Sequence, residues 1–264
     1  MKKNTKMNKD LTWTLKQQPT AGELAELVKL NVFTAQEARA IATTKGKMSD
    51  ASKVTTVVHV LLDASGSMES VRDSTITGYN EYVNSLKKDG GKYKLSLTAF
   101  DSDMTQKLRL VKIHENVHVD DVPELDRKTF VPNGGTPLYD AFCTTLKEVK
   151  ARPDEKHLFI VLTDGGENAS QKYTSEDMKE LKKQYEDEGN WTFVYLGANQ
   201  DAIATAKSFG VSYSNASNFN ATAVGTSVMY ASLSSATRSF SASPTMSTSS
   251  FYTEDQKLEN ENAK

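Results

Sequence analysis

The chain has 264 residues, and its 32 lysines and arginines nearly balance its 34 aspartates and glutamates, which leaves a formal net charge of −2. Such a mixture creates no strong field of one sign, so we expect neither nucleic acid nor an anionic membrane as a partner. The length suits one large α/β domain with appendages, or two small domains.

The cysteine content and the start of the chain bear on its compartment. Cys143 is the single cysteine, so no intramolecular disulfide forms and a reducing compartment is favoured. The basic start, residues 1–10, is not followed by the apolar run of a secretory signal. No stretch approaches the roughly 20 apolar residues of a membrane-spanning helix. We therefore expect a soluble, intracellular protein.

Residues 1–50 are predicted to contain a small helical hairpin after a loose polar start. Two capping boxes, which begin at Thr20 and Thr34, each open a run with helical apolar spacing. The hairpin is either a packing arm or an oligomerisation element, since it is similar to short oligomerisation hairpins of bacterial proteins. Residues 43–53 are typical of a linker.

Strand and helix patterns alternate beyond the linker, which predicts a doubly wound, mainly parallel α/β sheet. The segment 106–113 follows its neighbour through a tight turn and is therefore predicted as an antiparallel edge strand. Residues 114–135 are expected to be irregular, and the Ser/Thr-rich polar residues 241–264 to be a disordered tail. The predicted strands are 54–62, 93–100, 106–113, 157–163 and 191–196, and the predicted helices are 71–86, 137–150, 174–188, 202–209 and 221–240.

Two aspartates follow largely apolar strands. Asp63 follows the strand 54–62, and Asp164 follows the strand 157–163. In doubly wound sheets, ligands bind beyond the carboxyl ends of the strands, where the strand order reverses. If these two strands are neighbours at that point, the two carboxylates converge.

Covalent and phosphoryl-transfer chemistry fit the segment D-A-S-G-S poorly. Asp63 stands two residues before Ser65 and Ser67 stands two residues after it, whereas the nucleophile elbow of a hydrolase has glycines at both positions. The phosphate-binding motif GxxxxGK[ST] is absent, and Ser65 occupies the place where phosphoaspartyl enzymes usually carry a second acid. None of the four histidines stands at a comparable strand end, and His59 and His157 lie inside predicted strands, where packing explains them.

A site for a hard divalent cation is consistent with these residues. Mg²⁺ takes about six oxygen ligands at ~2.1 Å and usually keeps some water. Two carboxylates balance its charge, hydroxyls add neutral ligands, and Gly66 allows the backbone to come close. Pro137 suits the first turn of a helix directly after the threonine. The predicted ligands are Asp63, Ser65, Ser67, Thr136 and Asp164.

These segments together resemble the metal-ion-dependent adhesion site (MIDAS) of von Willebrand factor A (VWA) domains. The matching pieces are D-x-S-x-S at 63–67, G-T-P-L at 135–138 and T-D-G at 163–165, and all five ligand positions of the family pattern are present. The resemblance covers roughly residues 54–240. The segment 196–211 is also similar to stand-alone bacterial and phage members.

The resemblance implies a VWA domain at 54–240 with a complete MIDAS that holds Mg²⁺, or alternatively Mn²⁺ or Ca²⁺. It implies that the serines and the threonine bind the ion directly, that one or both aspartates act through water, and that one coordination position remains open for a partner's Glu or Asp. The expected function is therefore a metal-dependent protein-interaction module without catalytic activity of its own.

The resemblance also suggests partners and alternatives. The partner would be a component of a bacterial or phage complex, or an AAA+ ATPase, and homo-oligomers would form through the N-terminal hairpin. One alternative is a structural virion or scaffold assembly protein. Another is a metal-dependent phosphatase or hydrolase, against which the lack of a general base counts. The expected location is the cytoplasm of a bacterium or a phage-infected host, or a virion.

Five residues near the predicted ligands have simpler interpretations. Asp101 and Asp103 follow another strand, where we expect a solvated turn. Asp140 is predicted to be an ordinary acid in the first turn of a helix. Tyr139 and Cys143 are expected to be packing residues.

Overall fold

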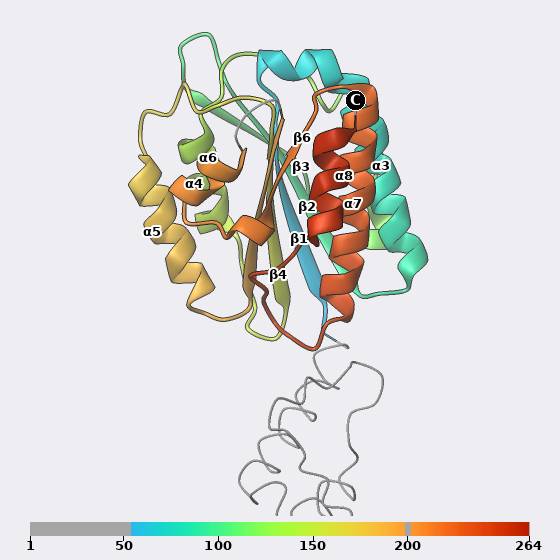
Figure 1. The fold of residues 1–264 in the computed structure, drawn as a ribbon. Helices are drawn as coiled ribbons and strands as arrows, with labels where there is room; N and C mark the ends of the chain where they lie inside the picture. The colour runs from blue at the N-terminus through green and yellow to red at the C-terminus, as the bar shows by residue number, and fades with distance from the viewer. Residues whose placement is uncertain (1–53, 199–201, 264) are drawn as a thin grey trace, which may run out of the picture. The chain divides into compact units, whose positions relative to one another are not determined.

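A six-stranded sheet forms the centre of the domain (Figure 1). The computed structural model describes residues 54–198 and 202–263, all of which belong to one unit, Asp50–Lys264. The helical hairpin predicted within residues 1–50 lies outside the described residues.

The strand order is β3-β2-β1-β4-β5-β6. β1 pairs in parallel with β2 on one side and with β4 on the other, so the order reverses between β1 and β4. Only β3 is antiparallel to its neighbour among the described strands. These pairings confirm the predicted doubly wound, mainly parallel sheet with one antiparallel edge strand. The strands are β1 (Thr56–Asp63), β2 (Tyr93–Ser102), β3 (Leu108–His118), β4 (Lys156–Thr163), β5 (Trp191–Ala198) and β6 (Ala216–Phe219).

Helices cover both faces of the sheet, with α3, α7 and α8 on one face and α4, α5 and α6 on the other (Figure 1). Such a sandwich follows from the crossover connections between parallel strands, which place successive helices against the sheet. Within the described part of the chain, no helix is both long enough and apolar enough to cross a membrane. The helices are α3 (Arg72–Asp89), α4 (Leu138–Glu148), α5 (Ser175–Glu186), α6 (Ala202–Ser208), α7 (Ala223–Ala242) and α8 (Glu254–Asn262), and the 3₁₀ turns are η1 (Gly66–Val71), η2 (Val119–Asp121) and η3 (Tyr213–Asn215).

The central strands are buried on both faces, which explains their continuous apolar sequences. Every residue of β1 is buried, as is every residue of β4. Val58 and Val60 pack into the core on the α3 and α7 side, whereas Leu61 and Phe159 pack into the core on the α4 and α5 side. Alternate side chains of a strand point to opposite faces, so one strand supplies both cores.

The antiparallel edge strand β3 extends further than predicted. It continues to His118, through residues that were expected to be irregular. His114 is buried there, and its Nε2 lies 2.9 Å from the hydroxyl oxygen of Tyr79 on α3. Asn116 has a left-handed backbone (φ 52°) beside a break in the β2–β3 register, typical of a β-bulge. The bulge interrupts the alternation of side chains, so the sequence pattern failed to indicate a strand here.

The prediction of a disordered tail over 241–264 is wrong for the described residues 241–263, since α7 continues to Ala242 and Thr248 N donates to Thr192 Oγ1 at 2.9 Å. Phe251 and Tyr252 are 6% and 2% exposed and belong to the core on the α7 side. Thr253 then opens α8 with a capping box. Two aromatic side chains therefore anchor a segment whose overall composition is polar.

The strand β6 was missing from the predicted elements, and polar contacts tie it to α8. Its four residues include two polar ones and form no apolar run. The side-chain amide of Asn260 on α8 donates to Ser217 Oγ on β6 at 2.9 Å, and both residues are fully buried. Contacts of this kind carry no hydrophobic periodicity, so patterns of apolar residues do not indicate them.

Candidate metal centre

Asp63 is the last residue of β1 and is completely buried. Its Oδ1 accepts a hydrogen bond from the backbone N–H of Ser65 at 2.7 Å, and its Oδ2 accepts one from Thr163 Oγ1 at 2.5 Å. Thr163 is the last residue of β4, the neighbouring strand at the switch point. Both carboxylate oxygens therefore have a fixed position before any ligand binds.

A chain of hydroxyl contacts connects the loop after β1 with the loop after β4. The hydroxyl oxygens of Ser65 and Ser67 lie 3.1 Å apart, and Ser67 Oγ donates to Asp164 Oδ1 at 2.7 Å. Ser65 is buried, whereas Ser67 is exposed, so the chain leads from the protein interior to the surface. Four of the five predicted ligands thus lie together at the carboxyl ends of β1 and β4.

Thr136, the fifth predicted ligand, approaches the same place from the loop before α4. A Cβ atom placed on Gly165 would lie 3.3 Å from Thr136 Oγ1 and 3.8 Å from Ser67 Oγ. Both hydroxyls therefore border one small region beside Asp164. The backbone of Thr136 is held through Asn168, whose side-chain oxygen accepts from Thr136 N at 2.8 Å and whose own N–H donates to Thr136 O at 3.1 Å.

Gly134 lets the loop before Thr136 come close to its neighbours. Its φ of +65° lies in the left-handed region, and a Cβ atom there would meet the carbonyl oxygen of Ser102 at 1.8 Å. The carbonyl of Gly134 accepts from Gly66 N at 3.0 Å, and Gly135 N donates to Ser102 Oγ at 2.9 Å. The glycines thus connect this loop to both the Asp63 loop and the end of β2.

The electrostatics of the five residues fit a bound cation. Burial raises the pKa of Asp63 to about 6, although hydrogen bonds from Thr163 and Ser65 act in the opposite direction. Burial also raises the pKa of Asp164, again opposed by the hydrogen bond from Ser67. Within residues 54–198 and 202–263, neither carboxylate forms an ion pair with a basic side chain. A cation at this point would supply the missing positive charge and favour both ionised forms.

The ligand types indicate which cation suits the site. The described residues contain no group of three or more His, Cys, Asp or Glu side chains that could hold a metal ion. Two carboxylates and three hydroxyls offer oxygen atoms only, a set that suits hard cations such as Mg²⁺ and Mn²⁺. The residues therefore fit a cation of this class.

Several residues that support the loops were not recognised in the sequence. Thr163 belongs to the T-D-G motif, but only the structure reveals that it orients Asp63. Glu167 accepts from the backbone N–H groups of Ala169 and Ser170 and from Tyr139 N. The segment D-G-G-E-N contained the signal, because a Glu and an Asn in a glycine-rich loop are suited to accept backbone hydrogen bonds.

Asp140 and Asp101 have larger roles than predicted. Asp140 is buried and accepts from the backbone N–H groups of residues 171–173, so it braces the loop after β4 rather than merely facing a helix N-terminus. Asp101 is buried and paired with Arg109, so the solvated turn expected there is wrong. Asp103 is exposed and accepts from Thr105 within a turn, as predicted.

The two packing residues and the histidines agree with their predictions. Cys143 is buried in the core beside α4, and Tyr139 packs against that core. His59 and His157 are buried within β1 and β4, with His59 Nε2 and His157 Nδ1 3.2 Å apart. The ring of His157 also stacks on that of Trp191, with the ring centroids 4.4 Å apart.

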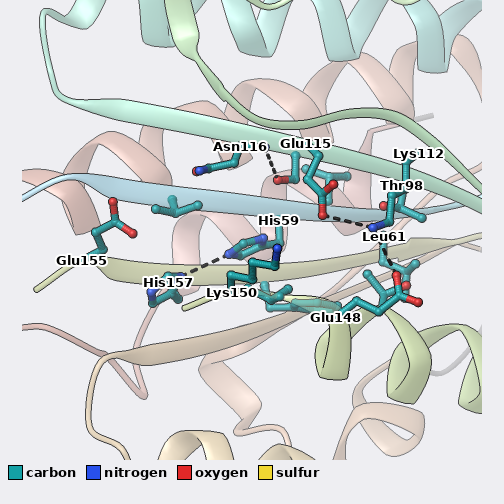
Figure 2. A pocket seen from close by; sticks show the side chains of 16 residues that line it. His59, Leu61, Thr98, Lys112, Glu115, Asn116, Glu148, Lys150, Glu155 and His157 are labelled. Atoms are coloured by element: carbon teal, nitrogen blue, oxygen red, sulfur yellow. Dashed lines mark hydrogen bonds and ion pairs between the residues drawn. The ribbon is translucent and has the colours of Figure 1, made fainter. Parts of the chain in front are cut away.

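A separate cavity of about 280 Å³ borders these histidines (Figure 2). It is lined by residues of β1 to β4, of the end of α4 and of the segment between α4 and β4. Three of its charged groups pair with one another, since Lys112 Nζ lies 3.1 Å from Glu115 and 3.2 Å from Glu148. The cavity includes none of the five predicted ligands, so it is distinct from the candidate metal centre.

Comparisons with known proteins agree with this architecture. No protein-family model and no curated protein matches the chain. Among solved structures, the open conformation of the pilus adhesin SpaC from Lactobacillus rhamnosus GG matches with a TM-score of 0.54 and 15% identity, over 69% of this chain and 30% of the adhesin. A von Willebrand factor type A protein from Catenulispora acidiphila matches with a TM-score of 0.46 and 16% identity, over 72% and 42% of the two chains.

A third similar structure is the manganese-loaded TRAP protein of Plasmodium vivax, with a TM-score of 0.47 and 18% identity, over 64% of this chain and 69% of that protein. The chain spans less than half the length of the adhesin and of the Catenulispora protein. At these identities the similarity concerns the fold. The described residues have a mixed, mainly parallel α/β fold of the Rossmann-like kind, which the SpaC structure shares.

Proposed function

We propose that the chain is a protein-interaction module in which Asp63, Ser65, Ser67, Thr136 and Asp164 hold one divalent cation, Mg²⁺ or Mn²⁺. The observation that carries the proposal is that two carboxylates, with no basic partner among the described residues, converge on three hydroxyl groups at the switch point of the sheet. The resemblance of the three segments to a MIDAS supports the same assignment.

The charges of the ligands favour an acidic partner. Asp63 and Asp164 together offset the charge of a divalent ion, and the three hydroxyls add none. The bound ion would therefore accept a further anionic oxygen without an excess of negative charge, in exchange for a bound water. A Glu or Asp side chain of a protein partner has this chemistry. Ser67 and Asp164 reach the surface, so a partner has access.

We further propose that the domain has no catalytic activity of its own. Acid–base chemistry requires a group near the reacting atoms that titrates at the working pH. None of the five residues is a histidine, and a bound cation would keep Asp63 and Asp164 ionised as its ligands rather than free to exchange protons. The buried His59 and His157 contact each other instead. A bacterial or phage complex, or an AAA+ ATPase, remains the proposed source of the partner.

Calorimetric titration with Mn²⁺ tests the metal assignment. Wild-type protein should bind one ion per chain, and Asp63→Ala should lose most of the heat, because one balancing charge and a fixed ligand are removed. Asp103→Ala is the matched control, since Asp103 is an exposed acid in the turn after β2. The control should bind like wild type. Equal binding by Asp63→Ala and wild type would refute the site.

A further inference from the structure

A second cavity lies directly beside the candidate metal centre. It has a volume of about 270 Å³, and we call it the side cavity. Ala64, which forms part of its wall, stands between the predicted ligands Asp63 and Ser65. The backbone of Ala64 is fixed on both sides, since its N–H donates to Phe100 O at 2.8 Å and its carbonyl accepts from Asn133 N at 2.7 Å. The side cavity is lined by Ala64, Ala99, Asp101, Arg109, Val111, Lys128, Thr129 and Val131.

The wall of the side cavity carries exposed apolar side chains. Val131 is 50% exposed and Val111 is 44% exposed, and both line the cavity. They are two of the six large hydrophobic residues that are exposed in the described part of the chain. Exposed apolar residues gathered around a hollow are typical of an interaction surface. An aliphatic side chain is therefore a suitable occupant.

The charged groups of the side cavity favour an anionic segment. Asp101 is neutralised by its ion pair with Arg109. Lys128 is exposed, and its ammonium group forms no ion pair with any other residue that the structure describes. The polar part of the wall thus has a net positive charge. A partner segment that brings a carboxylate to the metal would be attracted to this side as well.

The volume allows one aliphatic side chain to enter. A cavity of about 150 Å³ is enough to bind benzene in a protein core. Ala64 lines the side cavity, and its two neighbours in the chain are predicted metal ligands. Consecutive residues of an extended partner peptide are ~3.8 Å apart. A short partner segment is therefore long enough to reach both the candidate metal centre and the side cavity.

We propose that the side cavity takes a Val, Leu or Ile side chain that lies one or two residues from the acidic residue of the partner. This inference rests on the proposed metal-dependent function and specifies the partner as an acidic segment with an adjacent aliphatic residue. Burial of such a side chain strengthens binding by roughly 10- to 100-fold relative to alanine.

Two displayed peptide libraries test the proposal against the full chain. One has a fixed central Glu between randomised residues, and the other has a fixed central Gln. In Mg²⁺, the Glu library should be enriched and the Gln library should not, and EDTA should abolish the enrichment. Within the enriched Glu peptides, Val, Leu or Ile should predominate at one position within two residues of the Glu.

Matched variants then locate the aliphatic residue. Val131→Asn should weaken binding of a selected peptide about tenfold, while the same peptide with alanine in place of its aliphatic residue should be nearly insensitive to this substitution. Val224→Asn is the control, because Val224 is equally exposed (53%) but lies on α7 and lines none of the side cavity. Thermal unfolding should show both variants to be folded.

The outcomes separate the two proposals. Mg²⁺-dependent enrichment of Glu without an aliphatic preference would overturn the side cavity and leave the metal-dependent function standing. Undiminished binding of the selected peptide to Val131→Asn would do the same. No Mg²⁺-dependent enrichment of the Glu library would overturn the proposed function, and this inference with it.

Discussion

The hydroxyl group of Thr163, at the end of β4, donates a hydrogen bond of 2.5 Å to the carboxylate of Asp63, at the end of β1. The two residues are 100 positions apart in the chain and meet because β1 and β4 are parallel neighbours. The contact holds the buried carboxylate in one orientation within the candidate metal centre.

Thr163→Val should weaken cation binding while the fold remains. The substitution keeps the shape of the side chain but removes the donor that orients Asp63. Loss of a residue that orients a metal ligand typically costs 10- to 100-fold in affinity. Calorimetric titration with Mn²⁺ measures the effect, and circular dichroism checks the fold. An unchanged affinity would show that Asp63 needs no orientation by Thr163.

Thr136→Ala should also weaken Mn²⁺ binding, whereas Thr136→Ser should retain most of it. Alanine removes the hydroxyl beside Gly165, and serine keeps it. If the Thr136 side chain only packed, serine and alanine would weaken Mn²⁺ binding about equally, because both lack the methyl group of threonine. Comparable losses in the two variants would therefore contradict a ligand role for the Thr136 hydroxyl.

Gly134→Ala should destabilise the fold by about 2–5 kcal/mol. A left-handed backbone costs a residue with a Cβ roughly 1–2 kcal/mol, and overpacking typically adds about 1–3 kcal/mol. Gly90→Ala is the matched control, since Gly90 has a similar φ of +72° but no atom within 4 Å of an added Cβ. Urea unfolding should give a clearly smaller loss for Gly90→Ala. An equal loss of unfolding free energy in Gly134→Ala and Gly90→Ala would mean that Ser102 moves aside without an energetic cost.

Folding stability should decrease as the pH falls below 6.5. Burial lowers the pKa of His59 to about 3, with a further contribution from His157, and burial lowers the pKa of His114 to about 4. Between those values and 6.5 the unfolded chain binds more protons than the folded chain, so acid favours unfolding. Asp63 acts in the opposite direction, because its folded pKa of about 6 exceeds the ordinary value of 3.8.

Urea unfolding at pH 7.0 and 5.5 measures this dependence. Each histidine that stays neutral in the fold contributes a loss of roughly 1 kcal/mol between pH 6.5 and 5.5. His114→Gln should reduce the difference between the two pH values, because glutamine does not titrate. An unaltered difference in this variant would exclude His114 as a source of the acid sensitivity.

Phe251→Ala should cost about 3–5 kcal/mol, the usual range for truncation of a buried phenylalanine. Its ring packs against Phe240 of α7 and Tyr252, with centroid distances of 6.3 and 4.9 Å. Leu258→Ala is the control, because Leu258 on α8 is 54% exposed and should change the stability by less than about 0.5 kcal/mol. A small effect of Phe251→Ala would restore the idea of a dispensable tail.

The local features of the site were accessible from the sequence. The apolar runs that end at Asp63 and Thr163 predict buried parallel strands, and the short spacing of Ser65 and Ser67 keeps both hydroxyls in the loop after β1. The glycines before Thr136 predict a tight loop. These inferences depend only on a few consecutive residues and on simple periodicities, which can be recognised directly in the sequence.

The long-range pairings were decided by the tertiary structure alone. The hydrogen bond from Thr163 to Asp63, the ion pair of Asp101 with Arg109 across the β2–β3 pair and the docking of Asn260 on Ser217 join residues through strand order and helix packing. No local pattern encodes such contacts, because a polar side chain looks the same in a sequence whether solvent or a buried partner satisfies it. The sequence determined which residues end the strands, and the packing of the sheet determined which of those ends meet.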